Sequence, residues 1–424
     1  MRKLLIISPY FPPSNAADMQ RIRTSLPYFE KFGWAAEVVC VNPKFSDLTK
    51  DKLLLHSVPK NIKIHLVNAF SKKITSKFGL GSIAIRSLLF YKNYVDRLLK
   101  KEKFDLIYFS TTQFPICILG KHWKEKFNIP YVIDMQDPWH SNYYQNKPKN
   151  ERPKKYWFSY RLNKYLEPIA LKSVDGLISV TKHYVDDLFQ RYPIIKNVPF
   201  AIVPFGVNET DFKIADQYIQ NQVIDLKDHK INIIYTGAVG DIMKESISFL
   251  CKTLAYLRQE QIHLYKKLHF YFIGTSYAPD NEGKATVLPI AKNHKVEDCV
   301  TERVTRIGYF DSLYLLKKAN ALMILGSDET SYNPSKIYTY ISASKPLISI
   351  FKLDSPAVSA IENSGAGSVI KYTENGAMQK LISAFEQIID HIPQVINRNS
   401  NHLKSYSAEK LTKKQCELFN QVIK

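Results

Sequence analysis

The sequence alternates short apolar runs, rich in β-branched residues, with helical stretches, and this alternation restricts the fold more than any other feature. Residues 3–8 precede a helical pattern over 17–32, and a second apolar run follows at 36–41. Such β-α-β units are typical of parallel sheets with helices on both faces. A second alternating series starts at residue 231. We therefore predict an α/β protein with two tandem doubly wound, Rossmann-like domains that face each other across a cleft.

The same pattern divides the chain into parts. We predict a first domain over residues 1–205, a polar linker over 206–228, a second domain over 229–400, and a helical segment over 401–424 that crosses back to the first domain. The strands expected in the second domain are residues 231–236, 268–273, 304–308, 321–325 and 346–351. Ligands of such sheets bind beyond the carboxyl ends of the strands, so the cleft is the expected ligand site.

Membrane segments and disulfides are not expected. The apolar run near the amino terminus stops at Ser8 and Pro9, short of the roughly 7 to 15 apolar residues of a signal peptide. The longest uncharged stretch, residues 106–120, is shorter than the roughly 20 apolar residues that span a bilayer. The 5 cysteines form no C-x-x-C pair, which excludes a zinc ribbon or dithiol site and favours a reducing, cytoplasmic compartment.

The positive charge is concentrated in the first half of the chain. Residues 1–205 hold 33 basic and 16 acidic side chains, whereas residues 206–424 hold 26 and 23. Two stretches, 72–103 and 139–166, are both basic and aromatic. Anionic lipid headgroups, phosphorylated acceptors and nucleic acid would each suit such a domain, and a solvated surface is the plain alternative.

A polar segment directly after the apolar run 321–325 predicts an anion site. Asn333 is a good N-cap and Pro334 a good first helical residue. The free amides of Ser335 and Lys336 would then point out of the helix start beside the Lys336 ammonium. A diphosphate fits this arrangement without a metal ion. The alternative is that the segment only caps a structural helix.

The first β-α junction, residues 8–21, lacks the G-x-G-x-x-G spacing that a dinucleotide requires, so a nicotinamide cofactor is not expected. Arg21 and Arg23 lie near the start of the following helix, the unfavourable end for a cation. At least one of them should therefore contact an anion. Pro27 should kink or shorten this helix.

Two carboxylates mark the end of the apolar run 131–135. Asp134 lies within the run, where a carboxylate is costly unless it is paired. Asp137 begins the following loop and can face the cleft, although it can also form an Asx-turn before Pro138. No D-x-D, H-E-x-x-H, G-x-S-x-G or P-loop motif occurs, and no metal or other cofactor is expected.

Several segments, taken together and in order, resemble the bacterial glycosyltransferases of family 4, which have the GT-B fold. They are residues 6–17 with 20–22, 134–139, 202–208, 235–237, and 334–340 leading to 345–346. The resemblance implies a retaining transferase, with a nucleotide-sugar donor held mainly by the second domain and an acceptor held by the first. The donor-binding residues that it implies are Gly237, Lys244, Ile307, Tyr309, Asn333, Ser335, Lys336 and Thr339.

The acceptor is expected in the first domain, at Asn15, Gln20, Arg21 and Trp139, with Asp137 as the catalytic residue that takes up the proton of the acceptor hydroxyl. Three positions depart from the family pattern. The family's paired glutamates fall on Ser331 and Thr339, and Asp18 stands where many relatives have a glycine near the donor phosphates. An acid at that point would repel a diphosphate.

The predicted function is transfer of a sugar onto a surface-polysaccharide or glycolipid precursor, at an anionic membrane surface on the cytoplasmic side. One alternative is a nucleotide-sugar epimerase of the same architecture, which would not need a basic first domain. Another is a degenerate transferase that serves as a nucleotide-binding or nucleic-acid-binding module. A nucleic-acid partner is not expected, because it would leave the segment 333–336 without a purpose.

Overall fold

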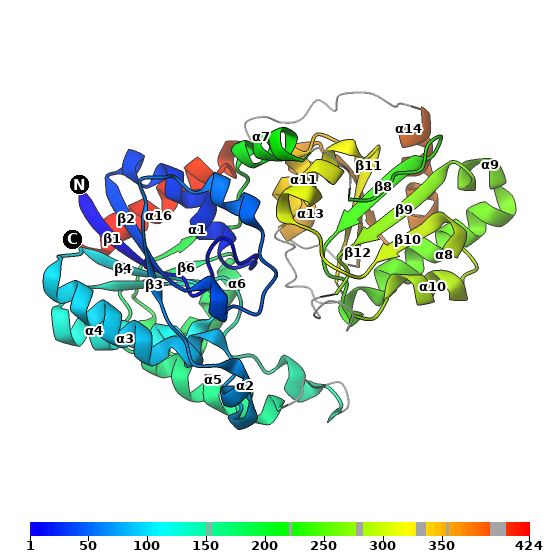
Figure 1. Cartoon of the computed structure of the whole chain (residues 1–424). Coiled ribbons are helices and arrows are strands. Elements are labelled where there is room, and N and C mark those ends of the chain that lie inside the picture. Colours follow the sequence, from blue (N-terminus) through cyan, green and yellow to red (C-terminus); the bar gives the residue numbers. More distant parts are fainter. Residues whose placement is uncertain are drawn as a thin grey trace. The chain divides into compact units, whose positions relative to one another are not determined.

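The computed structural model describes all residues except 150, 151, 153, 154, 220–222, 277–282, 328–335, 353–355 and 391–403. The chain forms two compact units, each built around its own parallel sheet (Figure 1). The first domain contains Met1–Gly206 and Ser407–Lys424, and the second contains Val207–Tyr406. The prediction of an α/β protein with two Rossmann-like domains is confirmed.

The first domain has a seven-stranded sheet in the order β3-β2-β1-β4-β5-β6-β7, and the paired strands run parallel. The strands are β1 Arg2–Ile7, β2 Trp34–Val41, β3 Lys63–Val67, β4 Leu106–Ser110, β5 Tyr131–Met135, β6 Gly176–Ser179 and β7 Phe200–Ile202. The helices are α1 Gln20–Ser25, α2 Lys72–Thr75, α3 Ile83–Lys101, α4 Ile118–Phe127, α5 Tyr156–Leu171, α6 Lys182–Arg191 and α16 Ala408–Val422. Strand order therefore reverses beside β1, which places the β1 and β4 edge at a switch point.

The helix predicted over 17–32 is shorter in the structure. Regular α-helix ends with α1, and 3₁₀ turns at Leu26–Tyr28 and Glu30–Phe32 follow. Pro27 lies in the first of these turns, which confirms the expected shortening. The missing amide hydrogen and fixed φ of proline account for the break.

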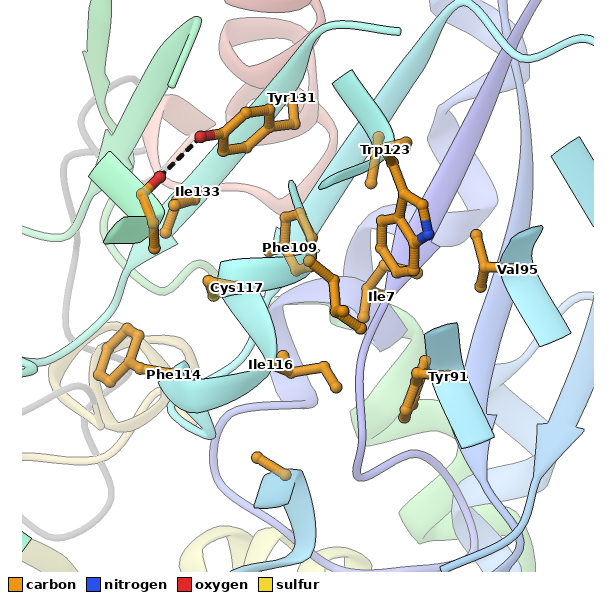
Figure 2. Packing of buried hydrophobic residues seen from close by; sticks show 14 of the residues in the cluster. Ile7, Tyr91, Val95, Phe109, Phe114, Ile116, Cys117, Trp123, Tyr131 and Ile133 are labelled. Atoms are coloured by element: carbon orange, nitrogen blue, oxygen red, sulfur yellow. Dashed lines mark hydrogen bonds between the residues drawn. The ribbon is translucent and has the colours of Figure 1, made fainter. Parts of the chain in front are cut away.

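Apolar side chains cover both faces of the first sheet. On one face, Phe109 of β4 stacks on Trp123 of α4 with ring centroids 5.9 Å apart, and Ile7 packs beside them (Figure 2). The buried hydroxyl of Tyr131 in the same cluster donates a hydrogen bond to the Ala170 carbonyl oxygen at 2.7 Å. All five residues of β4 are buried, as expected for a central parallel strand.

The carboxyl-terminal helix α16 covers the opposite face. Phe419 lies edge-on to Trp34 and Tyr108, with ring centroids 5.6 and 5.0 Å apart. Gln415 donates a hydrogen bond from Nε2 to Ser25 Oγ at 2.9 Å. The last helix of the chain is therefore part of the first domain's core.

The second domain has a six-stranded parallel sheet in the order β10-β9-β8-β11-β12-β13. The strands are β8 Ile231–Thr236, β9 Leu268–Ile273, β10 Val300–Arg303, β11 Ala321–Leu325, β12 Leu347–Phe351 and β13 Gly367–Lys371. The helices are α7 Glu209–Tyr218, α8 Lys244–Glu260, α9 Ile262–Tyr265, α10 Val287–Asn293, α11 Tyr309–Lys318, α12 Ile337–Ser342, α13 Pro356–Ser364 and α14 Ala377–Asp390. The strand predicted over 304–308 was wrong: β10 precedes that segment, and the sequence analysis missed β13.

The linker predicted over 206–228 also needs correction, because it contains α7. The Asn208 side chain caps this helix by accepting a hydrogen bond from the Thr210 amide. Asp211 in its first turn is buried and accepts a hydrogen bond from the Tyr309 hydroxyl of α11 at 3.0 Å. The N-cap and the acidic first turn were readable in the sequence, but the weak apolar periodicity of the helix concealed them.

Candidate functional site

In the second domain, two residues predicted to bind the donor meet at the carboxyl end of β8. The strand ends in a turn at Gly237, whose φ of 118° suits glycine. Lys336 extends its Nζ to this point and donates a hydrogen bond to the Thr236 carbonyl oxygen at 2.8 Å. A Cβ atom at position 237 would lie only 2.7 Å from Lys336 Nζ. The glycine therefore makes room for the ammonium group.

The Lys336 ammonium is desolvated, but it has a favourable contact with the face of an aromatic ring. Its Nζ is 3.8 Å from the ring centroid of Tyr235, and burial lowers the pKa of Lys336 to about 7. Within the part of the chain that the structure describes, no carboxylate forms an ion pair with it. A dianionic group bound beside Lys336 would stabilise its protonated form. The phosphate contact of Lys336 stays a prediction.

A small hydrogen-bond network supports this corner of the second domain. The Thr236 amide donates to the Tyr340 hydroxyl of α12 at 2.7 Å, and Ser312 of α11 donates to Thr236 Oγ1 at 3.0 Å. The network joins α11 and α12 to the end of β8 and limits the positions open to Lys336. Ser312 was not predicted, since a lone hydroxyl in a helix gives no local signal.

The other predicted donor residues lie at the same edge of the sheet. Lys244 begins α8, which follows β8 after a 3₁₀ turn at Asp241–Met243. Ile307 lies between β10 and α11, and Tyr309 is the first residue of α11. Thr339 is partly exposed on α12. The Tyr309 hydroxyl is engaged by Asp211, so any contact with a base would come from its ring. Asn333 and Ser335 lie outside the described residues, as does the predicted N-cap with Pro334.

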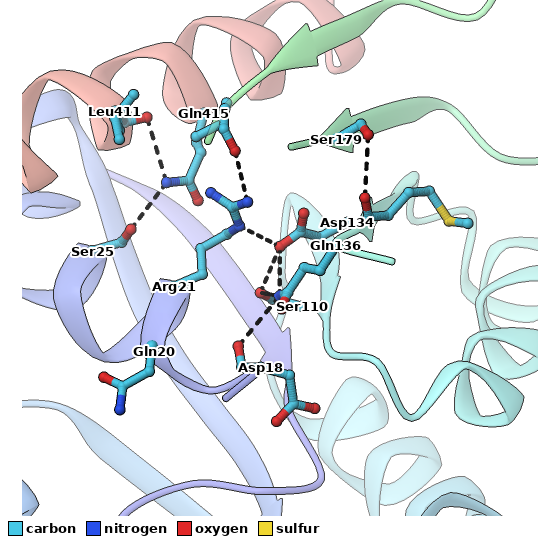
Figure 3. A network of polar contacts seen from close by, with 12 residues as sticks. Asp18, Gln20, Arg21, Ser25, Ser110, Asp134, Gln136, Ser179, Leu411 and Gln415 are labelled. Carbon is cyan, nitrogen blue, oxygen red and sulfur yellow. Dashed lines mark hydrogen bonds and ion pairs between the residues drawn. The ribbon is translucent and has the colours of Figure 1, made fainter. Parts of the chain in front are cut away.

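In the first domain, a buried ion pair joins α1 to β5. Arg21 Nε lies 2.6 Å from Asp134 Oδ2, and both side chains are at most 2% exposed (Figure 3). Arg21 also donates to the Val203 carbonyl oxygen at 2.7 Å, and its guanidinium lies 4.8 Å from the Phe205 ring centroid. The anionic partner expected for Arg21 is thus Asp134. Its predicted role in binding the acceptor was wrong, because the guanidinium is enclosed by its own domain.

Asp134 is held by further donors, which confirms that a carboxylate inside this strand must be paired. Its Oδ2 accepts hydrogen bonds from Gln136 Nε2 at 2.8 Å and Ser110 Oγ at 3.0 Å (Figure 3). Burial raises the pKa of Asp134, and the charge of Arg21 opposes this effect. Sequence analysis missed Ser110 and Gln136, although both are polar residues at the carboxyl ends of strands.

Asp18 is also turned into the first domain. Its Oδ2 accepts hydrogen bonds from Thr111 Oγ1 at 2.8 Å and from the Thr112 amide at 3.1 Å. The side chain is buried, and burial raises its pKa. Its partners lie in the loop after β4. The repulsion expected from an acid at this position is thus weakened by local hydrogen bonding and a smaller tendency to ionise.

Asp137 lies just outside this closed network. It is exposed at the start of the loop after β5. Desolvation by the surrounding protein and the like charges of Asp18 and Asp134 raise the pKa of Asp137 to about 6. An accessible carboxylate that ionises close to neutral pH has the properties of a general base.

The remaining acceptor predictions have different outcomes. Trp139 is buried, stacks on Phe114 with centroids 5.5 Å apart, and donates from Nε1 to Asn163 Oδ1 at 3.1 Å. Its predicted acceptor contact was wrong, since its large apolar ring fills the core. Asn15 is buried at the β1–α1 junction, and Gln20 accepts a hydrogen bond from Arg23 Nε at 2.7 Å. No contact in the structure tests the predicted roles of Asn15 and Gln20.

A second buried cluster, which sequence analysis missed, fixes the loop that carries Asp137. Glu167 of α5 is fully buried and accepts from Arg191 at 2.6 Å and from the Tyr192 hydroxyl at 2.7 Å. His140 Nδ1 lies 3.1 Å from Arg191. The loop after β5 is therefore held at His140 and can present Asp137 in a constant position.

Neither a metal-binding cluster nor a membrane-spanning helix occurs in the part of the chain that the structure describes. Among these residues, no three His, Cys, Asp or Glu side chains are grouped so that they could hold a metal ion. None of their helices is both long enough and apolar enough to cross a membrane.

Comparison with known proteins identifies the architecture. Residues 27–211 match the family model described as Glycosyltransferase Family 4, the family that the motifs resemble. The matched range includes two of the motif segments, 134–139 and 202–208. A glycosyltransferase from Rickettsia africae superposes with a TM-score of 0.60 at 14% identity, covering 100% of this chain and 99% of that one. For WaaG, a glycosyltransferase involved in lipopolysaccharide biosynthesis, the TM-score is 0.57 at 15% identity, with 98% and 99% covered.

TarM of S. aureus, solved as a point mutant with UDP, fondaparinux and an α-GlcNAc-glycerol, gives a TM-score of 0.59 at 10% identity, with 99% and 100% covered. At these identities the likeness establishes the fold, which is GT-B. No curated protein matches the chain.

Proposed function

We propose that this chain, a GT-B protein whose residues 27–211 match glycosyltransferase family 4, transfers a sugar from a nucleotide-sugar donor to a surface-polysaccharide or glycolipid precursor. The observation that carries the proposal is the Lys336 ammonium at the end of β8, which lies beside Gly237 and lacks a carboxylate partner among the described residues. UDP is the natural first probe, because TarM was solved with UDP.

The reaction divides between the two domains. The bond from the anomeric carbon to the diphosphate oxygen breaks, and negative charge develops on the leaving diphosphate. Lys336 stabilises this charge; one preorganised cation of this kind is typically worth about 3 kcal/mol. The acceptor oxygen forms the new bond to the anomeric carbon, and its proton passes to the carboxylate of Asp137. The retaining stereochemistry follows from the family resemblance.

The proposed transfer is independent of metal ions. In this proposal the Lys336 ammonium neutralises charge on the diphosphate, a role that a divalent cation has in other enzymes. Turnover should therefore persist in excess EDTA. Loss of activity in EDTA with recovery in Mg²⁺ or Mn²⁺ would contradict this part of the proposal.

The proposed class of acceptor is based on the positive charge of the first domain and on the similarity of the chain to solved structures. The first domain carries most of the excess positive charge, which suits a phosphorylated or lipid-linked acceptor at an anionic membrane surface. WaaG and WaaB, which share the fold, are named for lipopolysaccharide synthesis. We therefore place the reaction on the cytoplasmic face of the cell membrane, with no nucleic-acid partner.

A binding panel followed by a transfer assay tests the proposal. Nucleoside diphosphates and nucleotide sugars are added at increasing concentration while thermal unfolding is recorded. A ligand at 100 times its dissociation constant should stabilise the protein by about 2.7 kcal/mol. If no nucleotide stabilises the chain, the donor site is wrong.

The bound nucleotide sugar is then incubated with lipid-linked and oligosaccharide acceptors. Transfer to an acceptor supports the proposal. Binding without transfer supports the degenerate nucleotide-binding module, and interconversion of the free nucleotide sugar without an acceptor supports the epimerase.

A further inference from the structure

Large apolar side chains are exposed on two neighbouring elements of the first domain. Ile74 of α2 is 64% exposed, and Phe78 of the following 3₁₀ turn is 72% exposed. Trp157, in the first turn of α5, is 64% exposed. Single exposed apolar residues are ordinary, but exposed apolar residues that gather on adjacent elements indicate an interaction surface.

Direct contacts hold the two elements side by side (Figure 1). Lys155, at the N-cap of α5, donates a hydrogen bond to the Ser76 carbonyl oxygen at 3.0 Å. Gly79 lies against the Phe158 ring, so that a Cβ atom on this glycine would meet the ring at 3.0 Å. The exposed residues of both elements therefore belong to one patch rather than to two separate loops.

The exposed face of α5 continues this patch along the helix. Trp157, Arg161 and Tyr165 are spaced four residues apart and therefore lie on one face. All three are exposed, whereas Glu167 and Ala170 on other faces are buried. The Arg161 guanidinium lies 5.7 Å from the centroid of the Trp157 ring. An apolar ring beside a cation is typical of side chains at the boundary between lipid and water.

The charge of the same elements is positive. Lys73 and Lys77 are exposed in α2 and its following turn, and those segments contain no acid. Lys72 pairs with Asp47 at 3.0 Å. The single acid of α5 is Glu167, which is buried and paired with Arg191. The exposed carboxyl groups that would repel an anionic surface are thus absent from the described residues of α2 and α5.

We propose that Ile74, Phe78, Trp157, Arg161 and Tyr165, here called the α2–α5 patch, insert into the headgroup boundary of a bilayer that contains anionic lipid. Apolar side chains supply burial, aromatic residues lie at the headgroup level, and the lysines contact lipid phosphates. Single-stranded nucleic acid fits less well, because the exposed aliphatic Ile74 offers no ring for base stacking. The inference deepens the membrane location of the proposed function, but it does not depend on sugar transfer.

The four tryptophans of the chain make the test direct. Trp34, Trp123 and Trp139 are buried, at 0%, 0% and 6% exposed, so Trp157 is the exposed tryptophan. Tryptophan emission of the full chain is recorded while vesicles of phosphatidylglycerol and phosphatidylcholine, or of phosphatidylcholine alone, are added at low salt. We expect a blue shift with the anionic vesicles, together with quenching when their acyl chains are brominated.

Matched variants distinguish insertion of the α2–α5 patch into the bilayer from electrostatic attraction to the bilayer surface. Phe78→Ser should weaken vesicle binding on the order of tenfold, whereas Ile194→Ser, which removes an equally exposed apolar side chain (72%) elsewhere in the first domain, should not. The double variant Lys73→Glu and Lys77→Glu should weaken binding mainly at low salt. Far-UV circular dichroism and the thermal shift with UDP report whether fold and donor site remain intact.

Three results would overturn the inference. Vesicle binding without quenching by brominated chains would show that Trp157 does not insert. An equal loss of vesicle binding in Phe78→Ser and Ile194→Ser would show that the α2–α5 patch has no special role in binding the membrane. Quenching by single-stranded DNA, but not by anionic vesicles, would assign the patch to nucleic acid. A chain that binds vesicles but no nucleotide would sustain this inference and contradict the proposed function.

Discussion

Each domain contains a cation near the carboxyl edge of its sheet, and the two cations differ in the partners that surround them. Arg21 in the first domain has Asp134 at 2.6 Å and a carbonyl oxygen at 2.7 Å. Lys336 in the second domain has a carbonyl oxygen at 2.8 Å and the face of the Tyr235 ring. The first charge is neutralised within the protein and holds the fold together. The second has no carboxylate partner among the residues that the structure describes, and we propose that it binds a donor phosphate.

The carboxylates of the first domain repeat this contrast on a smaller scale. Asp134 and Asp18 are buried and hydrogen-bonded, whereas Asp137 is exposed and its pKa is raised to about 6 by desolvation and by neighbouring acids. Buried carboxylates with hydrogen bonds from their own domain have a structural role, whereas an accessible carboxylate with a raised pKa is a candidate for chemistry. Substitutions at the two kinds of charge should therefore have different consequences.

The largest expected effect is on catalysis at Asp137. Asp137→Asn is nearly isosteric and can still cap the turn, but it cannot accept a proton. We expect a loss of roughly 10²- to 10⁴-fold in turnover at saturating acceptor, with unchanged fold and donor affinity. Steady-state kinetics and calorimetry with UDP measure the two quantities. A variant that keeps more than about a tenth of the wild-type turnover would make Asp137 a structural residue.

The next effect is on stability at Arg21. Arg21→Met leaves the Asp134 carboxylate buried without its counterion, which should cost about 3 to 5 kcal/mol of unfolding free energy. Denaturant titration measures this loss. Lys182→Met is the control, because the exposed Lys182–Asp186 pair should contribute at most about 0.5 kcal/mol. Similar losses in the two variants would show that the buried pair has no special role.

Substitution of Lys336, the cation of the second domain, should change nucleotide affinity instead of stability. Lys336→Met removes a buried cation that has no counterion among the described residues, so stability should stay the same or increase. Affinity for UDP should fall by about 1.5 to 3 kcal/mol, the range of a charge-assisted hydrogen bond. Lys380→Met, at an exposed position of the same domain, is the control. Unchanged UDP affinity in calorimetry would remove the phosphate role of Lys336.

The smallest expected effect is on the pH profile. The pKa of Lys336 is lowered to about 7, so its protonated, binding form is lost as pH rises above that value. The pKa of Asp137 is raised to about 6, so its ionised, active form is lost as pH falls below that value. kcat/KM should rise through about pH 6 and then fall by up to about tenfold per unit above pH 7.

The variant Lys336→Arg tests whether Lys336 causes the decline of kcat/KM above pH 7, since arginine stays protonated at these pH values. A nucleotide sugar is used as donor because its diphosphate does not titrate in the neutral and mildly alkaline range. If the decline above pH 7 persists in Lys336→Arg, the group responsible is not Lys336.

Local sequence patterns were enough to predict the layered architecture and the positions of two carboxylates, Asp134 and Asp137. Alternation of apolar runs with helical stretches predicted two parallel sheets, because side-chain periodicity depends only on the local backbone. The same local logic identified Asp137 as a loop residue and Asp134 as a carboxylate that must be paired. The errors at the linker and at β10 were also local, where periodicity was weak.

Contacts between segments that are distant in the sequence, in contrast, determine which charged side chains are paired within the protein. Asp134 lies far from Arg21 in the sequence, and nothing local distinguishes a paired arginine from one that binds a ligand. Trp139 looked accessible in a polar loop, yet its ring stacks on Phe114 in the core. The last helix, α16, completes the first domain's core through Phe419, although the whole second domain separates them in the chain. Burial and pairing depend on elements that are distant in sequence, so only the folded chain can show which charges have a partner within the protein.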